Sequence, residues 1–105
     1  MLEITELEVR FDDDGFLVDP AEWTETSART IAHQDGLGEL DPQQLSLLHQ
    51  LRLEYLRTGA VPALMHICHL GGYEAGCMTR LFPDAREAWR IAGLPNPGEE
   101  AKAYM

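Results

Sequence analysis

Two Asp-Pro pairs constrain the fold of this chain most strongly, because each one marks where a helix can begin. They lie at Asp19-Pro20 and Asp41-Pro42. Aspartate is a preferred N-cap, and proline suits the first helical position, where its missing N–H is not needed. Glu22, which follows the first pair, completes a capping pattern. We therefore predict one helix over 20–33 and a second over 42–58.

The second predicted helix carries a broad apolar arc. At about 100° per residue, Arg52 lies near the edge of this arc, which makes 42–58 the main core helix. The arc comprises Leu45, Leu47, Leu48, Leu51, Tyr55 and Leu56. Leu53 falls outside the arc, and we expect it to be partly exposed or to face a partner. Gly59 ends the helix.

Proline and glycine also divide the remaining chain. We predict a shorter helix over 62–70 and another near 74–80. A further helix is predicted over 84–92, capped by Asp84 and stopped by Gly93. The prolines that follow prevent this helix from continuing.

The segment before the first Asp-Pro pair alternates apolar and polar side chains, which is the period of a β-strand. The alternation changes parity across Thr5-Glu6, and Asp14-Gly15 supplies the positive φ that a tight hairpin turn needs. We therefore predict a three-stranded antiparallel meander over 2–18, with 16–18 as its third strand.

These elements predict an α+β fold that is mostly helical. A small N-terminal antiparallel meander packs on about five short helices. Residues 1–97 form the single domain expected of a chain of 105 residues. Residues 98–105 follow the last proline, and we expect them to form a flexible C-terminal tail.

Composition narrows the class of protein. A hydrophobic content of 45% and a charged content of 25% are ordinary for a globular domain. No apolar run approaches the ~20 residues of a membrane span, and the acidic N-terminus lacks the basic region of a secretory signal. We expect a cytoplasmic protein without membrane association, whose two cysteines are thiols.

Charge argues against nucleic acid as a partner. Eight basic and eighteen acidic residues give a formal net charge of −10, whereas affinity for phosphates comes from Lys and Arg. Arg80, Arg86 and Arg90 form at most a small cationic cluster. The predicted helix 62–70 could pair with the core helix as a helix-turn-helix, but it has no Lys or Arg to reach base edges. The charge better suits docking on a basic protein partner.

The residue types that bind metals cluster over 66–77 but do not converge. On a helix, His66 and His69 share a face, whereas Cys68 lies about 160° from His66. We predict no metal site and no cofactor, with surface histidines and a core cysteine. Cys77, three residues before Arg80, is a better candidate than Cys68 for a reactive thiol, although a buried cysteine that packs as a small hydrophobe is the more ordinary role.

Two C-terminal motifs are more specific than any feature above: Arg80-Leu81-Phe82-Pro83 and Ile91-Ala92-Gly93-Leu94-Pro95-Asn96-Pro97. They resemble the signature of the DsrC/TusE family of sulfur-relay proteins, which are related to the gamma component of dissimilatory sulfite reductase. Weaker anchors stand upstream in family order, at Asp14-Gly15-Phe16-Leu17, Trp23 and Leu51-Arg52. The chain departs from the family pattern over 69–78, where members carry a longer, lysine-rich stretch.

The resemblance implies a flexible arm whose penultimate cysteine carries sulfur. The penultimate residue here is Tyr104; counted from the Pro-x-Pro, the carrier position falls on Glu100, and the upstream cysteine of two-cysteine members falls on Trp89. Neither Cys68 nor Cys77 occupies a carrier position. Trp89 either fills the groove against which a tail would fold or is an exposed anchor for a partner.

Three functions compete. The first is a DsrC/TusE-like protein without the carrier cysteine, which acts as a binding or regulatory member of a sulfur-relay system and docks on a sulfurtransferase complex or a sulfite-reductase-like enzyme. The second is a divergent sulfur carrier that uses Cys77 or Cys68, and the third is a helix-turn-helix DNA-binding regulator. We favour the first, with no catalytic residue; the oligomeric state stays open. The family-motif and partner-docking candidates are Arg80, Arg86, Trp89, Arg90, Leu94, Pro95 and Pro97.

Overall fold

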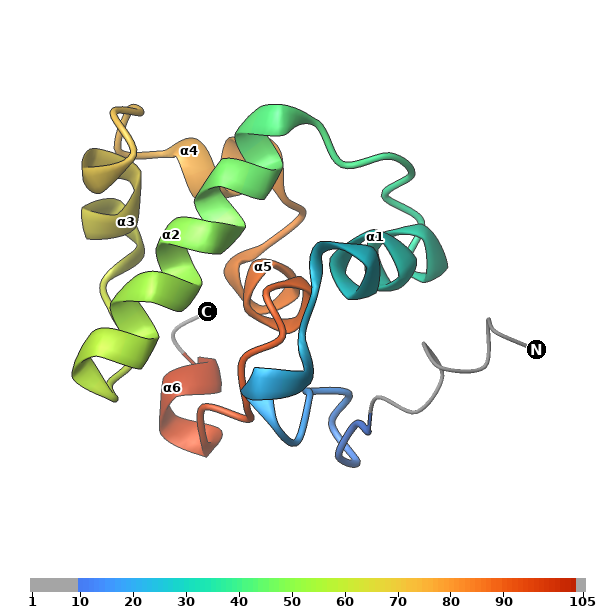
Figure 1. The fold of residues 1–105 in the computed structure, drawn as a ribbon. Helices are drawn as coiled ribbons and strands as arrows, with labels where there is room; N and C mark the ends of the chain where they lie inside the picture. The colour runs from blue at the N-terminus through green and yellow to red at the C-terminus, as the bar shows by residue number, and fades with distance from the viewer. Residues whose placement is uncertain (1–9, 104–105) are drawn as a thin grey trace.

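The computed structural model describes residues 10–103, and over this range the protein is a compact arrangement of short helices (Figure 1). The elements are η2 (Pro20–Glu22), α1 (Glu25–Gln34), α2 (Pro42–Thr58), α3 (Leu64–Leu70), α4 (Cys77–Leu81), α5 (Ala85–Ile91) and α6 (Glu99–Ala103). Helix α5 occupies the middle and contacts α1, α2 and α4, while α3 contacts α2 and α4. None of the helices described over 10–103 is long and apolar enough to cross a membrane.

The core helix forms where its sequence predicts. The Asp41 carboxylate caps α2 by accepting the Gln44 N–H at 2.8 Å, and the Gln44 side-chain oxygen accepts the Asp41 N–H at 2.9 Å. Gly59 ends the helix at φ +74°, the left-handed conformation of a helix C-cap. Leu53 is exposed, in agreement with its position outside the arc, but Leu56 is also 57% exposed. The buried face of α2 is narrower than predicted, since at 100° per residue Leu56 lies about 140° around the helix from buried Leu51.

The first predicted helix is wrong in one respect, because it is broken in two. Asp19 caps only the short turn η2, and the chain is extended again at Trp23. Thr24 then caps α1, accepting the Ser27 N–H at 3.1 Å in a reciprocal capping box that the sequence analysis overlooked. The break lets the Trp23 side chain contact Ile91 and Gly93, which are about 70 positions away in the sequence.

The predicted β-meander is not present over the described residues. Phe11 and Leu17 form an isolated antiparallel bridge, and 16–18 is not a strand. The paired arms are short, because the Asp12 side chain accepts the backbone N–H groups of Asp14 and Phe16 and η2 begins soon afterwards. The first two predicted strands, over 2–9, lie outside the described residues. Over residues 10–103 the fold is mostly helical rather than α+β.

The later helices lie within about three residues of their predicted positions. Helix α3 begins at Leu64 rather than Pro62, and α4 begins at Cys77 rather than near 74. Asp84 caps α5 by accepting the Glu87 N–H at 2.8 Å. Beyond the Pro-x-Pro the chain forms the five-residue helix α6. The flexibility of the 98–105 tail stays a prediction.

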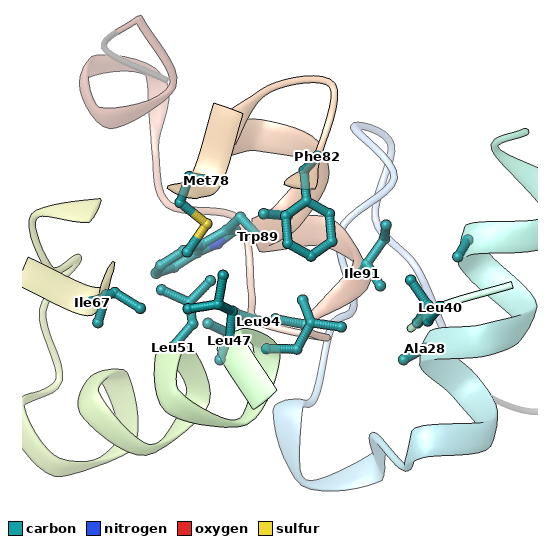
Figure 2. Close-up of a cluster of buried hydrophobic side chains, with 14 of the residues drawn as sticks. Ala28, Leu40, Leu47, Leu51, Ile67, Met78, Phe82, Trp89, Ile91 and Leu94 are labelled. Carbon is teal, nitrogen blue, oxygen red and sulfur yellow. The ribbon is translucent and has the colours of Figure 1, made fainter. Parts of the chain in front are cut away.

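The core is centred on Trp89. Figure 2 shows its indole between Met78 and Phe82 on one side and leucines on the other, including Leu51 and Leu94. All five side chains are at most 3% exposed. Burial of large apolar side chains at about 25 cal/mol per Å² is the main stabilising contribution in a domain of this size.

A further set of interior contacts joins the break between η2 and α1 to the end of α5. The Trp23 indole donates to the Ile91 carbonyl at 2.8 Å. Arg52 donates to the Ala92 carbonyl at 3.0 Å and to the Pro20 carbonyl at 2.9 Å, and its guanidinium lies 4.3 Å from the centre of the Trp23 ring. Burial lowers the pKa of the Arg52 guanidinium. We call these contacts the Trp23–Arg52 junction.

Gly93 is required at this junction for two reasons. Its φ is +70°, and a Cβ added to it would lie 2.1 Å from Cδ1 of Trp23. Few residues other than glycine adopt this φ, and no overlap of this size is tolerated between a side chain and a ring.

Gly93→Ala is therefore expected to lower the free energy of unfolding by about 3 kcal/mol or more, measured by urea denaturation. Gly59→Ala is the matched control: its φ is also positive, at +74°, but nothing lies within 4 Å of its added Cβ. The control is expected to cost about 1–2 kcal/mol for the left-handed backbone alone. Equal losses for the two variants would contradict the close packing at Gly93.

Candidate functional site

The C-terminal arm begins with residues 94–97, which we call the arm base, and the arm base is packed against the core. Trp89 is fully buried, and its indole donates to the Pro95 carbonyl at 2.7 Å. Tyr55 meets the indole edge-to-face, with 5.4 Å between ring centres. Leu94 is also fully buried, while Pro95 and Pro97 are partly exposed. Trp89 therefore fills the interior, and the alternative of an exposed anchor is wrong.

The arm is also fastened to the N-terminal turn through Asn96. Its side-chain amide donates to Asp12 Oδ2 at 3.1 Å and to Asp14 Oδ2 at 2.8 Å, and its Oδ1 accepts the Gly98 N–H at 2.9 Å. The backbone N–H of Phe16, followed by the Asn96 amide, lowers the pKa of the Asp12 carboxyl. Asn96 was not among the predicted site residues, although it occupies the variable position of the Pro-x-Pro motif.

The family resemblance assigned carrier positions to three residues, and the structure describes two of them. Glu100 lies exposed on α6, and Trp89 is buried on α5. Tyr104 lies outside the described residues. The assignment of these residues to carrier positions stays a prediction.

The two cysteines form a disulfide, which corrects the expectation that both are thiols. Cys68 and Cys77 have their Cα atoms 5.8 Å apart, both are fully buried, and the chain has no free cysteine. The short connection between α3 and α4 brings the two sulfurs together, a proximity that judging each cysteine by itself could not reveal. Cross-linking a ring of about ten residues stabilises a protein by on the order of 3 kcal/mol.

The histidines near the cysteines do not form a metal site. His66 and His69 are exposed on α3, whereas Cys68 faces the core. The nearest carboxylate to His66 is Glu54, with 3.9 Å between Nε2 and Oε2. Across the part of the chain that the structure describes, no group of three metal-ligating side chains is found. The predicted surface histidines and core cysteine are confirmed.

The three candidate arginines differ in their surroundings. Arg80 is paired with Glu74, and this hydrogen bond lowers the pKa of the Glu74 carboxyl. Arg90 donates to the Gly15 carbonyl at 2.8 Å and pairs with Asp35. Arg86 is exposed on α5. Because Arg80 and Arg90 are paired with acids, these two side chains offer little positive potential to a nucleic acid.

A compact group of charges links α1 to α5. The Asp35 and Glu87 carboxyls approach Arg90 from the two helices, with Glu87 Oε2 4.0 Å from the guanidinium. This oxygen is buried and lacks a hydrogen-bond partner among the described residues. Burial, followed by the hydrogen bond and charge of Asp35, raises the pKa of Glu87 to about 7.

An open depression of about 390 Å³ lies elsewhere on the surface. It is lined by Thr26, Arg29, Thr30, His33, Gln34, Gly38 and Glu39. None of the family-motif residues lines it, and its lining contains no cysteine. The arm base and the disulfide are therefore the features that bear on function.

The raised pKa of Glu87 predicts how stability depends on pH. Between pH 4.5, the ordinary value, and pH about 7, the folded protein holds a proton that the unfolded chain has lost. The free energy of unfolding should therefore fall as pH rises through this window. Glu87→Gln should flatten this fall, measured by urea denaturation at several pH values, while Glu39→Gln, a change of an exposed carboxylate, should not. An unchanged slope in Glu87→Gln would contradict the burial of this carboxyl.

Comparison with known proteins identifies the scaffold. The family model described as "DsrC like protein" matches residues 3–99. The sulfurtransferase TusE homolog of Haemophilus influenzae is 30% identical, over 94% of this chain and 98% of its own. Sulfurtransferase TusE of Escherichia coli is 32% identical, over 86% of this chain and 90% of its own.

Solved structures agree. The oxidized gamma-subunit of the dissimilatory sulfite reductase (DsrC) from Archaeoglobus fulgidus superposes with a TM-score of 0.72 at 30% identity, covering 87% of this chain and 90% of the other. A chain of dissimilatory sulfite reductase I (DsrI) shares the fold with a TM-score of 0.76 at 24% identity, covering 87% of this chain and 89% of that one. The chain therefore belongs to the DsrC-like family, which includes the TusE sulfurtransferases.

Proposed function

We propose that this protein is a binding or regulatory member of a sulfur-relay system that docks on protein partners without carrying sulfur itself. One observation carries the proposal: both sulfurs that could act as nucleophiles are joined to each other and fully buried. Sulfur transfer needs an accessible thiolate. In this state the chain offers none.

The arm supports the same role. Glu100 places a carboxylate at the position where the family resemblance puts the carrier cysteine. The buried indole of Trp89 holds the Pro95 carbonyl, and Asn96 fastens the next turn to the acidic loop of Asp12 and Asp14. The arm base is thus fixed in one direction, which suits recognition by a partner more than delivery of cargo.

The relatives suggest the partners. Relatives in this family are named as sulfurtransferases and as the gamma-subunit of dissimilatory sulfite reductase. We propose that this chain binds a sulfurtransferase complex or a sulfite-reductase-like enzyme, in the cytoplasm, by occupying the surface that a cysteine-bearing member uses. A net charge of −10 favours a basic docking surface on that partner.

A divergent carrier that uses Cys77 or Cys68 is the second candidate, because the disulfide would supply two thiols once reduced. This role requires both reduction and exposure of a sulfur that is now fully buried. Persulfide loading separates the two candidates.

The wild-type protein, treated with polysulfide or a persulfide-bearing sulfurtransferase, is expected to gain no sulfur mass by intact mass spectrometry. Glu100→Cys should gain the mass of one sulfur atom, since it restores a thiol at the exposed arm position. Ala32→Cys, which places a thiol at a fully buried position of α1, is the matched control and should load far more slowly.

The alternative makes the opposite forecast. Rapid loading of the wild-type protein that is lost in Cys77→Ser or Cys68→Ser would identify a relocated carrier thiol and reject the binding role. Each serine variant must first show a native circular dichroism spectrum, so that loss of loading is not loss of fold.

Docking is expected to respond to the charge of Arg86, a family-motif residue that is exposed on α5. Because the proposed docking surface of the partner is basic, Arg86→Glu should strengthen capture of a sulfurtransferase complex that binds a cysteine-bearing member, by roughly twofold to tenfold. Surface plasmon resonance at two salt concentrations measures this effect. Arg29→Glu, on α1, is the control; equal gains for both variants would remove Arg86 from the docking surface.

A further inference from the structure

We propose that the Cys68–Cys77 disulfide is a reversible redox site that exchanges with a dithiol reductant, and that the connection between α3 and α4 is its gate. The inference concerns the chemistry of the two sulfurs and does not depend on which partner the protein binds. It rests on where the bond lies, what covers it and what holds the cover.

The bond is fully buried, and it joins the two ends of a connection that is largely exposed. Cys68 lies in the last turn of α3 and Cys77 is the first residue of α4, and both are fully buried. The residues between them are largely exposed: His69, Leu70, Gly72, Glu74, Ala75 and Gly76. Because both cysteines belong to the same buried cluster as Trp89, the proposal is that movement of this connection alone admits a reductant to the sulfurs.

Hydrogen bonds between neighbouring residues, the packing of Tyr73 and one exposed ion pair hold the gate closed. The Tyr73 N–H donates to the Cys68 carbonyl at 2.9 Å, and the Cys77 N–H donates to the Glu74 carbonyl at 3.0 Å. Tyr73 packs against the core cluster and lies close over Gly71. The Gly71 and Gly72 N–H groups also donate to the Ile67 and His69 carbonyls, at 3.1 and 3.0 Å. Glu74 forms an ion pair with Arg80, and the two side chains are each about half exposed.

The same segment is built to open. Gly72 has a φ of +81° and nothing lies within 4 Å of its added Cβ, and Gly76 is equally open. Segments with few apolar contacts and exposed backbone open locally at a lower free-energy cost than the whole domain. In the reducing compartment expected from the sequence, persistent disulfides are uncommon, and those that occur are mostly catalytic or redox-sensing.

The exchange is a balanced two-electron step. One thiolate of the dithiol attacks one Sγ, the Cys68–Cys77 bond breaks, and the other Sγ leaves as a thiolate that takes up a proton. The second thiol of the reductant then attacks the mixed disulfide and releases the remaining cysteine as a thiol. The protein gains two electrons and two protons, and the reductant becomes a disulfide.

The test follows reduction of the native, full-length protein by dithiothreitol, with alkylation and intact mass as the readout. We expect reduction at least a hundredfold slower in the native state than in urea, and restoration of the bond by oxidised dithiothreitol. Glu74→Gln should speed native reduction by roughly twofold to fivefold, the effect of losing a surface ion pair. Its rate in urea should match that of the wild type.

Gly59→Ala distinguishes local from global opening, because it destabilises the fold at the end of α2, away from the gate. An unchanged native reduction rate supports the gate, and a rate that follows global stability overturns it. The double variant Cys68→Ala/Cys77→Ala should keep a native circular dichroism spectrum. If that variant unfolds, the bond is a structural staple, and if both cysteines alkylate in the untreated native protein, there is no redox site; either result rejects the proposal.

Discussion

The Trp23–Arg52 junction is the interaction on which the rest of the structure depends. Helix α5 ends there, and two of its terminal carbonyls are satisfied by side chains from elsewhere in the chain, the Trp23 indole and the Arg52 guanidinium. Unpaired carbonyls at a buried helix end would be costly. The junction also explains why Gly93 follows: only a residue without a side chain lets the indole approach. Trp23, Arg52 and Gly93, which are far apart in the sequence, thus form one packed unit.

The arm follows directly after this junction. Two sets of hydrogen bonds hold the arm base in place. Trp89 holds the Pro95 carbonyl from the inside, and Asn96 ties the chain to the N-terminal turn from the outside. The scaffold of the family is therefore retained, and the sulfurs of Cys68 and Cys77 are bonded to each other. The proposal that this member binds partners without carrying sulfur rests on that bond and on Glu100, which stands where the family resemblance places the carrier cysteine.

Local signals were predictable from the sequence, and long-range ones were not. Asp41 and Gly59 delimit α2 because caps act within one turn. The resemblance carried by the C-terminal motifs identified the family correctly. The disulfide was missed because it depends on how α3 lies against α4, and the Asn96 contact with Asp12 spans 84 positions. The break at Trp23 was missed because a tertiary hydrogen bond outweighs the local helix signal.

The state of the cysteines tests the central claim most directly. The native protein, purified without reductant, is treated with iodoacetamide, and its intact mass is compared with that of samples alkylated in urea, before and after reduction. Our account predicts no adduct in the native protein, none in urea alone and two after reduction, because both sulfurs are joined. One or two adducts in the native protein would show an accessible thiol and contradict a role without sulfur carriage.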